Sequence, residues 1–292
     1  MQTHFDPVRL LAREFPAIGH EYAEPDVQLY ALGLGIPENP LDEDSLRFVY
    51  EGAKGNQLKV LPTFANVLAY PGFWAREADT GIDWRKLVHA EQQIVLNRPL
   101  PARGRVVGKN KVTAIWDRGA QRGCLLQQRR EVVDAQTGEA LATVTQLSLL
   151  RGNGGFEGGS EGTPPAPHVI PTRSPDQVID SKIPLHAALI YRLSGDLNPL
   201  HADPTVARSA GFERPILHGM ASMGIAAYAV VHGVLGNDTS RFAGMRVRFT
   251  APAVPGDLLR HEVWLDGNVV SLRTIAPARG VTVIDNARID LN

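Results

Sequence analysis

The sequence predicts an α+β protein in which antiparallel strands surround buried helices, and three observations lead to this prediction. Residues Ile216 to Leu235 are rich in Ala, Gly and Met and apolar nearly all round, which is typical of a buried helix rather than an amphipathic one. From Met245 onward, apolar and charged residues alternate as they do in a half-buried strand. Short elements of the first half also recur in the second, which indicates an internal duplication.

Composition limits the class of protein. The 292 residues are enough for one large domain or two ordinary ones, and 43% hydrophobic with 21% charged residues is typical of a globular chain. The net charge is -1 with no long block of like charge, so we expect neither nucleic acid nor a membrane as a partner. Without a signal peptide pattern or a run of ~18 apolar residues, the predicted location is cytoplasmic. Cys124 is the only cysteine, which excludes an intramolecular disulfide.

A Gly- and Pro-rich stretch from Arg151 to Pro175 divides the chain. It holds six glycines between Gly152 and Gly162, followed by five prolines. Such a stretch buries little apolar surface and is typical of a linker laid over a surface. We therefore predict a first domain over residues 1–152, a linker over 153–180 and a second domain over 181–292.

The duplication is visible in two pairs of segments. Leu61-Pro62-Thr63-Phe64 matches Leu217-His218-Gly219-Met220 at an offset of 156 residues, and the Pro/Gly element from Arg98 to Gly104 has a counterpart from Ala251 to Gly256. Strand-like segments follow each Pro/Gly element. A long helix wrapped by an antiparallel sheet is the hotdog architecture, so we predict a double hotdog, with two sheets that each wrap around a long buried helix.

The candidate chemistry lies in the run Asp196-Leu197-Asn198-Pro199-Leu200-His201. An Asn-Pro pair favours a turn, because the residue before proline is pushed out of the helical region. Asp196 and His201 can therefore converge, whereas in a continuous helix they would lie along its length. A carboxylate and an imidazole with an ordinary pKa near ~6.5 can share a water molecule and its proton transfers. Which of the two is the base stays open, and simple capping roles are the weaker interpretation.

Three neighbouring residues are candidates for a role beside Asp196 and His201. Asn198 lies between the pair and is expected to orient the water or one of the pair. The N–H of Gly219 is a candidate oxyanion donor, because the first N–H groups of a helix lack internal partners and the helix dipole favours negative charge there. His218 has no convergent partner in the sequence, so we predict that it is a structural hydrogen-bonding residue. No histidine spacing indicates a metal site, and we expect no metal and no redox cofactor.

The segment from Tyr191 to Met220 resembles the signature of (R)-specific enoyl-CoA hydratases of the MaoC-like family. The resemblance implies a double hotdog, a homodimer and an acyl-CoA substrate. It also implies addition of water to trans-2-enoyl-CoA to give (3R)-3-hydroxyacyl-CoA, in fatty-acid or steroid side-chain metabolism. Other motifs resemble the first repeat of double-hotdog hydratases, such as the hydratase region of peroxisomal multifunctional enzymes: Tyr30 to Gly35, Phe48 to Gly52, Val60 to Phe64 and His89 to Gln92.

The resemblance also implies roles for individual residues. Asp196 and His201 match the catalytic dyad, and Gly219 matches the oxyanion donor. The first half is expected to hold the acyl-CoA through His89, Ala90 and Arg118, although Ala90 stands where the family has glycine and Arg118 where it has lysine. The remaining residues expected to contact substrate are Phe249, for which an ordinary core position is equally favoured, and Leu197, Pro199 and Leu200.

The first half has lost the dyad on this reasoning. Asn39-Pro40-Leu41 echoes Asn198-Pro199-Leu200, and on that alignment Pro37 replaces Asp196 and Asp42 replaces His201. One active site per chain is therefore predicted.

Two other functions stay open from the sequence. A hotdog thioesterase would use a carboxylate and water to cleave the thioester, and a non-catalytic subunit would only bind acyl-CoA. The spacing of Asp196 and His201 argues against the first, and the intact pair argues against the second.

Overall fold

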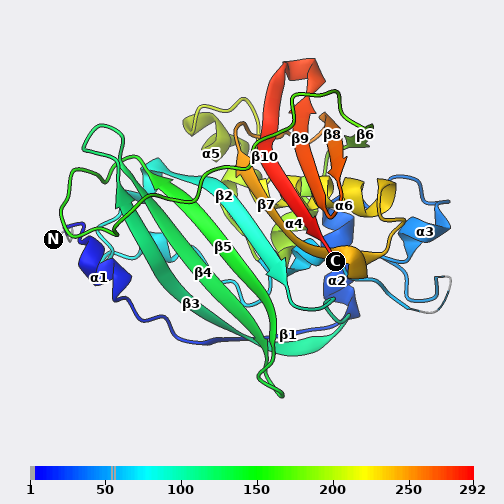
Figure 1. Cartoon of the computed structure of the whole chain (residues 1–292), viewed down its shortest axis with the longest axis horizontal. Coiled ribbons are helices and arrows are strands. Elements are labelled where there is room, and N and C mark those ends of the chain that lie inside the picture. Colours follow the sequence, from blue (N-terminus) through cyan, green and yellow to red (C-terminus); the bar gives the residue numbers. More distant parts are fainter. Residues whose placement is uncertain (1–3, 54, 56) are drawn as a thin grey trace.

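The computed structural model describes residues 4–53, 55 and 57–292. Ten antiparallel strands form one twisted sheet in the order β1-β3-β4-β5-β2-β7-β10-β9-β8-β6 (Figure 1). The strands are β1 Ile18–Tyr22, β2 Leu87–Leu96, β3 Gly104–Asp117, β4 Cys124–Asp134, β5 Ala140–Leu150, β6 Gln177–Lys182, β7 Phe242–Phe249, β8 Leu258–Asp266, β9 Val269–Ala276 and β10 Val281–Leu291.

The strand order shows the duplication directly. The first half contributes β1-β3-β4-β5-β2, and the second half contributes the same pattern as β6-β8-β9-β10-β7. The two halves meet where β2 pairs with β7, from Glu91 opposite Arg248 to Val95 opposite Gly244. We call this pairing the seam. The predicted α+β double hotdog is confirmed, with its two sheets joined edge to edge into one.

The helices are short apart from two. They are α1 Pro7–Leu11, α2 Glu24–Gly33, α3 Glu43–Leu46, α4 Ala187–Tyr191, α5 Pro204–Ser209 and α6 Gly219–Gly233, with 3-10 turns η1 Pro62–Asn66, η2 Trp74–Arg76, η3 Trp84–Lys86, η4 Arg192–Ser194, η5 Pro199–His201, η6 Thr239–Arg241 and η7 Pro277–Arg279. Within the described residues, no helix is both long enough and apolar enough to cross a bilayer.

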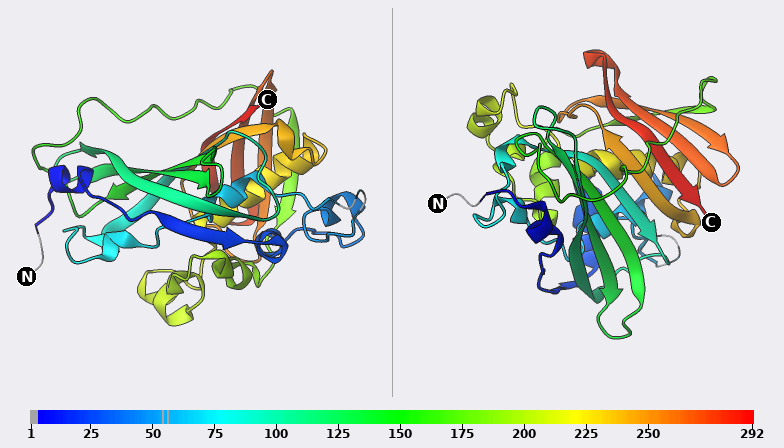
Figure 2. Two further views of the ribbon diagram at one scale, coloured as in Figure 1. Left: turned by 90° about the horizontal axis from the view of Figure 1, so that it is seen from below. Right: turned by 60° about the vertical axis from the view of Figure 1, so that its left-hand side comes forward.

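Helix α6 is the central helix of the second half, as the sequence predicts. Eleven of its fifteen residues are buried, and the second-half strands curve around it (Figure 2). Its small residues let neighbours approach closely: a Cβ added at Gly224 would lie 2.7 Å from the Leu34 side chain. Leu34 comes from the first half, so α6 packs between the two halves in a single apolar core.

The first half departs from the prediction of a long buried helix. At the place equivalent to α6, the described chain has only the five-residue turn η1, all of whose residues are buried. Proline opens this turn, and the chain leaves it through Ala69, whose φ of 49° lies in the left-handed region. The inner face of the first-half sheet is therefore covered by less helix than that of the second half.

The linker stretch has no helix or strand between residues 151 and 176, and it runs along the outside of the sheet (Figure 2). Side chains hold it there: Arg246 donates to the carbonyl oxygens of Pro165 and Ala166, and Asn286 donates to that of His168. Residues 177–180, which the sequence places in the linker, belong to β6. The division into two domains stays a prediction.

A buried carboxylate connects the halves at the seam. Glu91 on β2 is 5% exposed. Its Oε1 accepts hydrogen bonds from Arg248 Nε and Nη2 at 3.0 and 2.7 Å, and its Oε2 accepts from Arg246 Nε and Nη2 at 2.9 and 2.5 Å. Two guanidinium forks on β7 thus clamp one carboxylate on β2, and such charge-assisted pairs are among the stronger hydrogen bonds.

We predict that Glu91→Gln lowers the free energy of unfolding by about 1.5–3 kcal/mol, because the two guanidinium groups lose their counter-charge at a half-buried position. Urea unfolding measures the change. Glu131→Gln is the matched control, since Glu131 forms an exposed pair with Arg129 on β4 and should change stability by less than about 0.5 kcal/mol. Equal effects of the two substitutions would contradict this role for the seam.

Candidate active site

The turn that carries the predicted dyad is fixed by its own amide groups. Asn198 has φ −55° and ψ 121°, the extended conformation expected before proline. Its side-chain oxygen accepts a hydrogen bond from the N–H of Leu200 at 3.1 Å and caps η5. Its own N–H donates to Asp196 Oδ1 at 3.2 Å. Asn198 therefore orients Asp196 through its backbone N–H, while its side-chain oxygen caps the turn η5. We call residues 196–201 the dyad turn.

His201 lies at the buried end of the dyad turn and is 8% exposed. Its Nδ1 is 2.9 Å from the carbonyl oxygen of Ile216. Because a carbonyl oxygen only accepts, Nδ1 carries the proton, and in the neutral ring Nε2 keeps its lone pair. The structure therefore leaves Nε2 as the basic atom of the imidazole.

His218 joins the pair, which sequence reasoning did not anticipate. Its Nε2 donates to the backbone oxygen of Asp196 at 3.1 Å, and its ring stacks on that of His201 with centroids 3.7 Å apart. Its Nδ1 is buried and has no partner among the described residues. One ligand-type atom from each of Asp196, His201 and His218 lies within 4.8 Å of the others. A carboxylate with two imidazoles can handle protons, and the same donor set can also hold a metal ion.

Burial keeps the two imidazoles neutral. Desolvation lowers the pKa of His201 below its ordinary value. Desolvation, followed by the neighbouring His201, lowers the pKa of His218 to about 4. Tyr70, in the loop after η1, lies close enough to sense Asp196: burial first and then that carboxylate raise the pKa of the phenol to about 12. At neutral pH the site therefore holds two uncharged rings and a protonated phenol beside the carboxylate.

Gly219 opens helix α6 directly after His218, as predicted. The first N–H of a helix has no partner within it and lies at the positive end of the helix dipole. A Cβ added at Gly219 would sit 3.5 Å from the Phe249 ring, an ordinary contact. The arrangement offers an amide donor next to the dyad with an aromatic ring at its side.

Strand β2 of the first half also contributes a side chain to the region beside Gly219. His89 lies edge-on to Phe249 with ring centroids 5.0 Å apart, so two predicted substrate-binding residues meet beside Gly219. Ala90 is an extra residue in β2, because the pairing with β5 passes from His89 opposite Ser148 to Glu91 opposite Leu147. This bulge brings His89 Nε2 within 2.9 Å of Gln92 Oε1.

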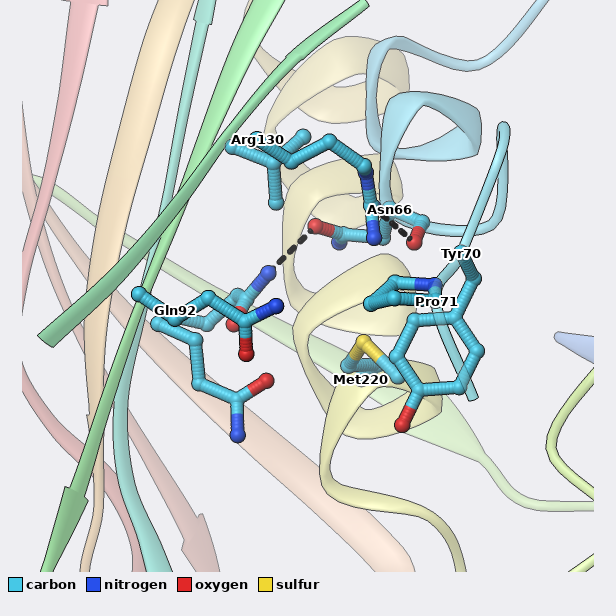
Figure 3. A pocket seen from close by; sticks show the side chains of 9 residues that line it. Asn66, Tyr70, Pro71, Gln92, Arg130 and Met220 are labelled. Atoms are coloured by element: carbon cyan, nitrogen blue, oxygen red, sulfur yellow. Dashed lines mark hydrogen bonds between the residues drawn. The ribbon is translucent and has the colours of Figure 1, made fainter. Parts of the chain in front are cut away.

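Asn66 and Tyr70 are site residues that the sequence reasoning missed, and Gln92 belongs to the motif His89 to Gln92 but was not singled out. Gln92 Nε2 donates to Asn66 Oδ1 at 2.8 Å (Figure 3), and both side chains are buried. One signal was available: Gln92 falls at an inward position of a strand whose next inward residues are Ile94 and Leu96. A polar residue in an apolar row indicates a site.

The other predicted substrate-binding residues are not part of this cluster. Arg118 is exposed in the β3–β4 loop, where its backbone pairs with Gly123. Leu197 is 60% exposed, Pro199 is also exposed, and Leu200 is half-buried. Their contact with substrate stays a prediction.

The equivalent position of the first half has kept the turn without the dyad. Asn39 Oδ1 accepts from Leu41 N–H at 3.0 Å, which repeats the cap made by Asn198. Asp42, in the place of His201, caps α3 through the N–H groups of Asp44 and Ser45. The described first half therefore carries a structural copy of the dyad turn, consistent with one site per chain.

Comparison with known proteins identifies the family. Residues 168–287 match the MaoC like domain, and residues 20–152 match the MFE-2 hydratase 2 N-terminal domain. Over 285 residues the chain is 35% identical to "Enoyl-CoA hydratase ChsH3" of Mycobacterium tuberculosis, covering 94% of each chain. The chain belongs to the MaoC-like hydratase family. The predicted family and the predicted enzyme class, a hydro-lyase, are confirmed.

Two further relatives extend this likeness. The MaoC-like chain is 36% identical to the mouse "Peroxisomal multifunctional enzyme type 2" over 97% of its own length, but spans only 38% of that longer protein. Its fold matches the crystal structure of a MaoC-like dehydratase from Phytophthora capsici with a TM-score of 0.86, at 31% identity over 98% and 99% of the two chains.

The lowered pKa values of two histidines predict a loss of stability in acid. Burial lowers the pKa values of His89 and His218 to about 4 in the folded protein, whereas in the unfolded chain they are near ~6.5. Between these values the unfolded chain binds more protons, so the free energy of unfolding falls as the pH drops from about 6.5 to 4. Each histidine contributes up to ~1.4 kcal/mol per pH unit.

Urea unfolding at pH 7, 6 and 5 tests this expectation. The variant His89→Gln, which removes one titrating group, should show a smaller dependence on pH than the unmodified protein. A protein as stable at pH 5 as at pH 7 would contradict the burial of neutral imidazoles.

Proposed function

We propose that this hydro-lyase adds water reversibly to trans-2-enoyl-CoA and gives (3R)-3-hydroxyacyl-CoA. The observation that carries the proposal is the convergence of Asp196 and His201 with His218, the residue directly before the first amide of α6. Hydration of a conjugated thioester needs a base for water, an acid for C2 and a donor for the enolate oxygen, and Asp196, His201 and the N–H of Gly219 can supply these roles between them. The relatives' names, enoyl-CoA hydratase and 3-hydroxyacyl-thioester dehydratase, support the same reaction.

The tautomer of His201 suggests which group is the base. Its Nδ1–H is held by the Ile216 carbonyl oxygen, so Nε2 can take a proton from a water molecule that Asp196 also holds by a hydrogen bond. The water oxygen then bonds to C3, and the double-bond electrons move to the thioester oxygen, where Gly219 N–H stabilises the negative charge. The imidazolium returns the proton to C2, so that one water supplies both added groups and His201 ends neutral.

The binding of the substrate is proposed to be shared between the halves. His89 and Phe249 meet beside Gly219, which favours contact with the reacting end of the acyl group. Arg118 is exposed and cationic, as a residue that contacts a CoA phosphate would be. A homodimer, a cytoplasmic location and a role in fatty-acid or steroid side-chain metabolism stay predictions, and the mechanism above uses no metal or redox cofactor.

Removal of either dyad group is expected to abolish hydration. Asp196→Asn and His201→Ala should each lower kcat for crotonyl-CoA by about 10²–10⁴, because each removes a proton-handling group while leaving the apolar core intact. The assay follows loss of enoyl absorbance, release of free thiol, and the configuration of the product at C3. Asp203→Asn is the matched control, since the side chain of Asp203 caps α5 and makes no other hydrogen bond within the described residues.

Full activity in either dyad variant would contradict the mechanism. Release of free thiol without hydration would favour the thioesterase, and binding without turnover would favour the non-catalytic subunit. A (3S) product would contradict the stereochemistry. Dialysis against EDTA should leave the rate unchanged, and a loss restored by Zn²⁺ would assign the cluster to a metal ion.

The amide of Gly219 can be removed without disturbing the helix. Proline is well accepted as the first residue of a helix, and His218, with φ −60° and ψ 138°, already has the conformation preferred before proline. We predict that Gly219→Pro lowers kcat by about 10²–10³.

The variant Gly219→Ala retains the N–H and is the control for added bulk. Its methyl group meets the Phe249 ring at an ordinary distance. The kcat of Gly219→Ala should therefore fall much less than that of Gly219→Pro. Equal activity of the two variants, with both folded by circular dichroism, would exclude this amide as the oxyanion donor.

A further inference from the structure

A polar pocket lies between the first-half sheet and helix α6 (Figure 3). It encloses about 10 Å³, which is room for about one water molecule. Most of its lining is polar: Asn66, Tyr70, Gln92, Gln128, Arg130 and Gln146.

Four of these polar residues come from the inner face of the sheet, where apolar residues are the rule, and Asn66 and Tyr70 come from η1 and the loop after it. Gln128 on β4 lies opposite Gln146 on β5, which lies opposite Gln92 on β2. The three glutamines form one row across neighbouring strands. This row lies in the half that has η1 in place of a long helix, so its side chains border the space that a helix would otherwise fill.

Arg130 is the charged residue of the pocket. It is 5% exposed, and its Nη2 donates to the carbonyl oxygens of Asn66 and Ala65 at 2.6 and 3.4 Å. Its Nε is buried and has no partner among the described residues. Its guanidinium carbon lies 5.7 Å from the Tyr70 ring centroid. No carboxylate in the described chain forms an ion pair with it.

Burying a cation without a counter-charge lowers the stability of the folded state, because the cation loses its hydration. Burial lowers the pKa of Arg130 to about 10, so the guanidinium stays charged at neutral pH. The neighbouring pair Glu91–Arg246 shows how this chain neutralises a buried charge elsewhere. At Arg130 the described residues supply only carbonyl oxygens and an aromatic face.

Three observations place the pocket next to the active site. Gln92 is bonded to His89, which meets Phe249 beside Gly219. Met220, which also lines the pocket, directly follows Gly219. Tyr70 senses the charge of Asp196. Gln92 and Met220 thus border the pocket and also adjoin the residues around Gly219.

Resting on the proposed hydratase activity, we infer that Arg130 selects enoyl-CoA substrates whose acyl chain ends in a carboxylate. The substrates are thus CoA monothioesters of short unsaturated dicarboxylic acids. A carboxylate supplies the missing counter-charge and accepts hydrogen bonds from the guanidinium edge that lacks protein partners. The competing role for Arg130 is structural, as a clamp on the last carbonyl groups of η1.

The first experiment uses the unmodified protein and pairs of trans-2-enoyl-CoA thioesters of four, six and eight carbons. Within each pair, one acyl chain ends in a carboxylate and the other in a methyl group. We expect kcat/KM for the carboxylate form to exceed that for the methyl form by about 30-fold or more at one chain length. This comparison does not depend on the folding of any variant.

The second experiment removes the charge. Arg130→Met keeps much of the length and should lower kcat/KM for the preferred carboxylate substrate by about 30-fold or more, with a change of only a few-fold for its methyl-ended partner. Arg130→Lys keeps a positive charge and should retain part of the preference. Arg129→Met is the matched control, because the adjacent Arg129 points to the other face of β4 and pairs with Glu131; it should behave as the unmodified protein.

The outcomes distinguish the role of Arg130 in substrate selection from the proposed hydratase activity. Hydration of methyl-ended substrates with no carboxylate preference at any length would overturn the role of Arg130 and leave the proposed hydratase intact. An equal loss on both substrates in Arg130→Met would assign Arg130 to the clamp on η1. Hydration of neither substrate class would overturn the proposed function itself.

Discussion

The hydrogen bond from His218 Nε2 to the backbone oxygen of Asp196 holds the two parts of the site together. It ties the dyad turn, which is an exposed loop for most of its length, to the first turn of the buried helix α6. The stacked rings of His201 and His218 and the bond from His201 Nδ1 to the Ile216 oxygen complete the same junction. The helix therefore fixes Asp196, His201 and the amide of Gly219, the groups of the proposed mechanism, relative to one another.

The two halves of the duplication differ in which structural features they retain. The second half retains a long central helix and with it the amide and the histidines that helix supports. The first half retains the sheet and a copy of the turn, in which Asp42 caps α3. Its central helix is reduced to η1, and the inner face of its sheet carries glutamines and Arg130. The half without the dyad is also the one in which a polar pocket lies against the inner face of the sheet.

Much of this arrangement could be predicted from the sequence. The Asn-Pro turn, the helix entry at Gly219 and the Pro/Gly elements are local signals, and they located the dyad, the helix and the duplication. The missing signals were non-local. His218 converges with His201 only because the chain between them folds back through α5, and Arg130 reaches the pocket only because β4 lies beside β5. The predicted first-half helix failed because the match of Leu61 to Phe64 with the start of α6 does not specify how long a helix follows.

The most direct test of the central claim is the fate of solvent hydrogen in a single turnover. Crotonyl-CoA, or the preferred carboxylate-ended analogue, is incubated with the protein in D₂O and the product is analysed by NMR. One base that takes and returns the proton predicts (3R)-3-hydroxyacyl-CoA with one deuterium at C2, added on the same face as the oxygen. Addition on opposite faces, or free CoA as the product, would contradict the account.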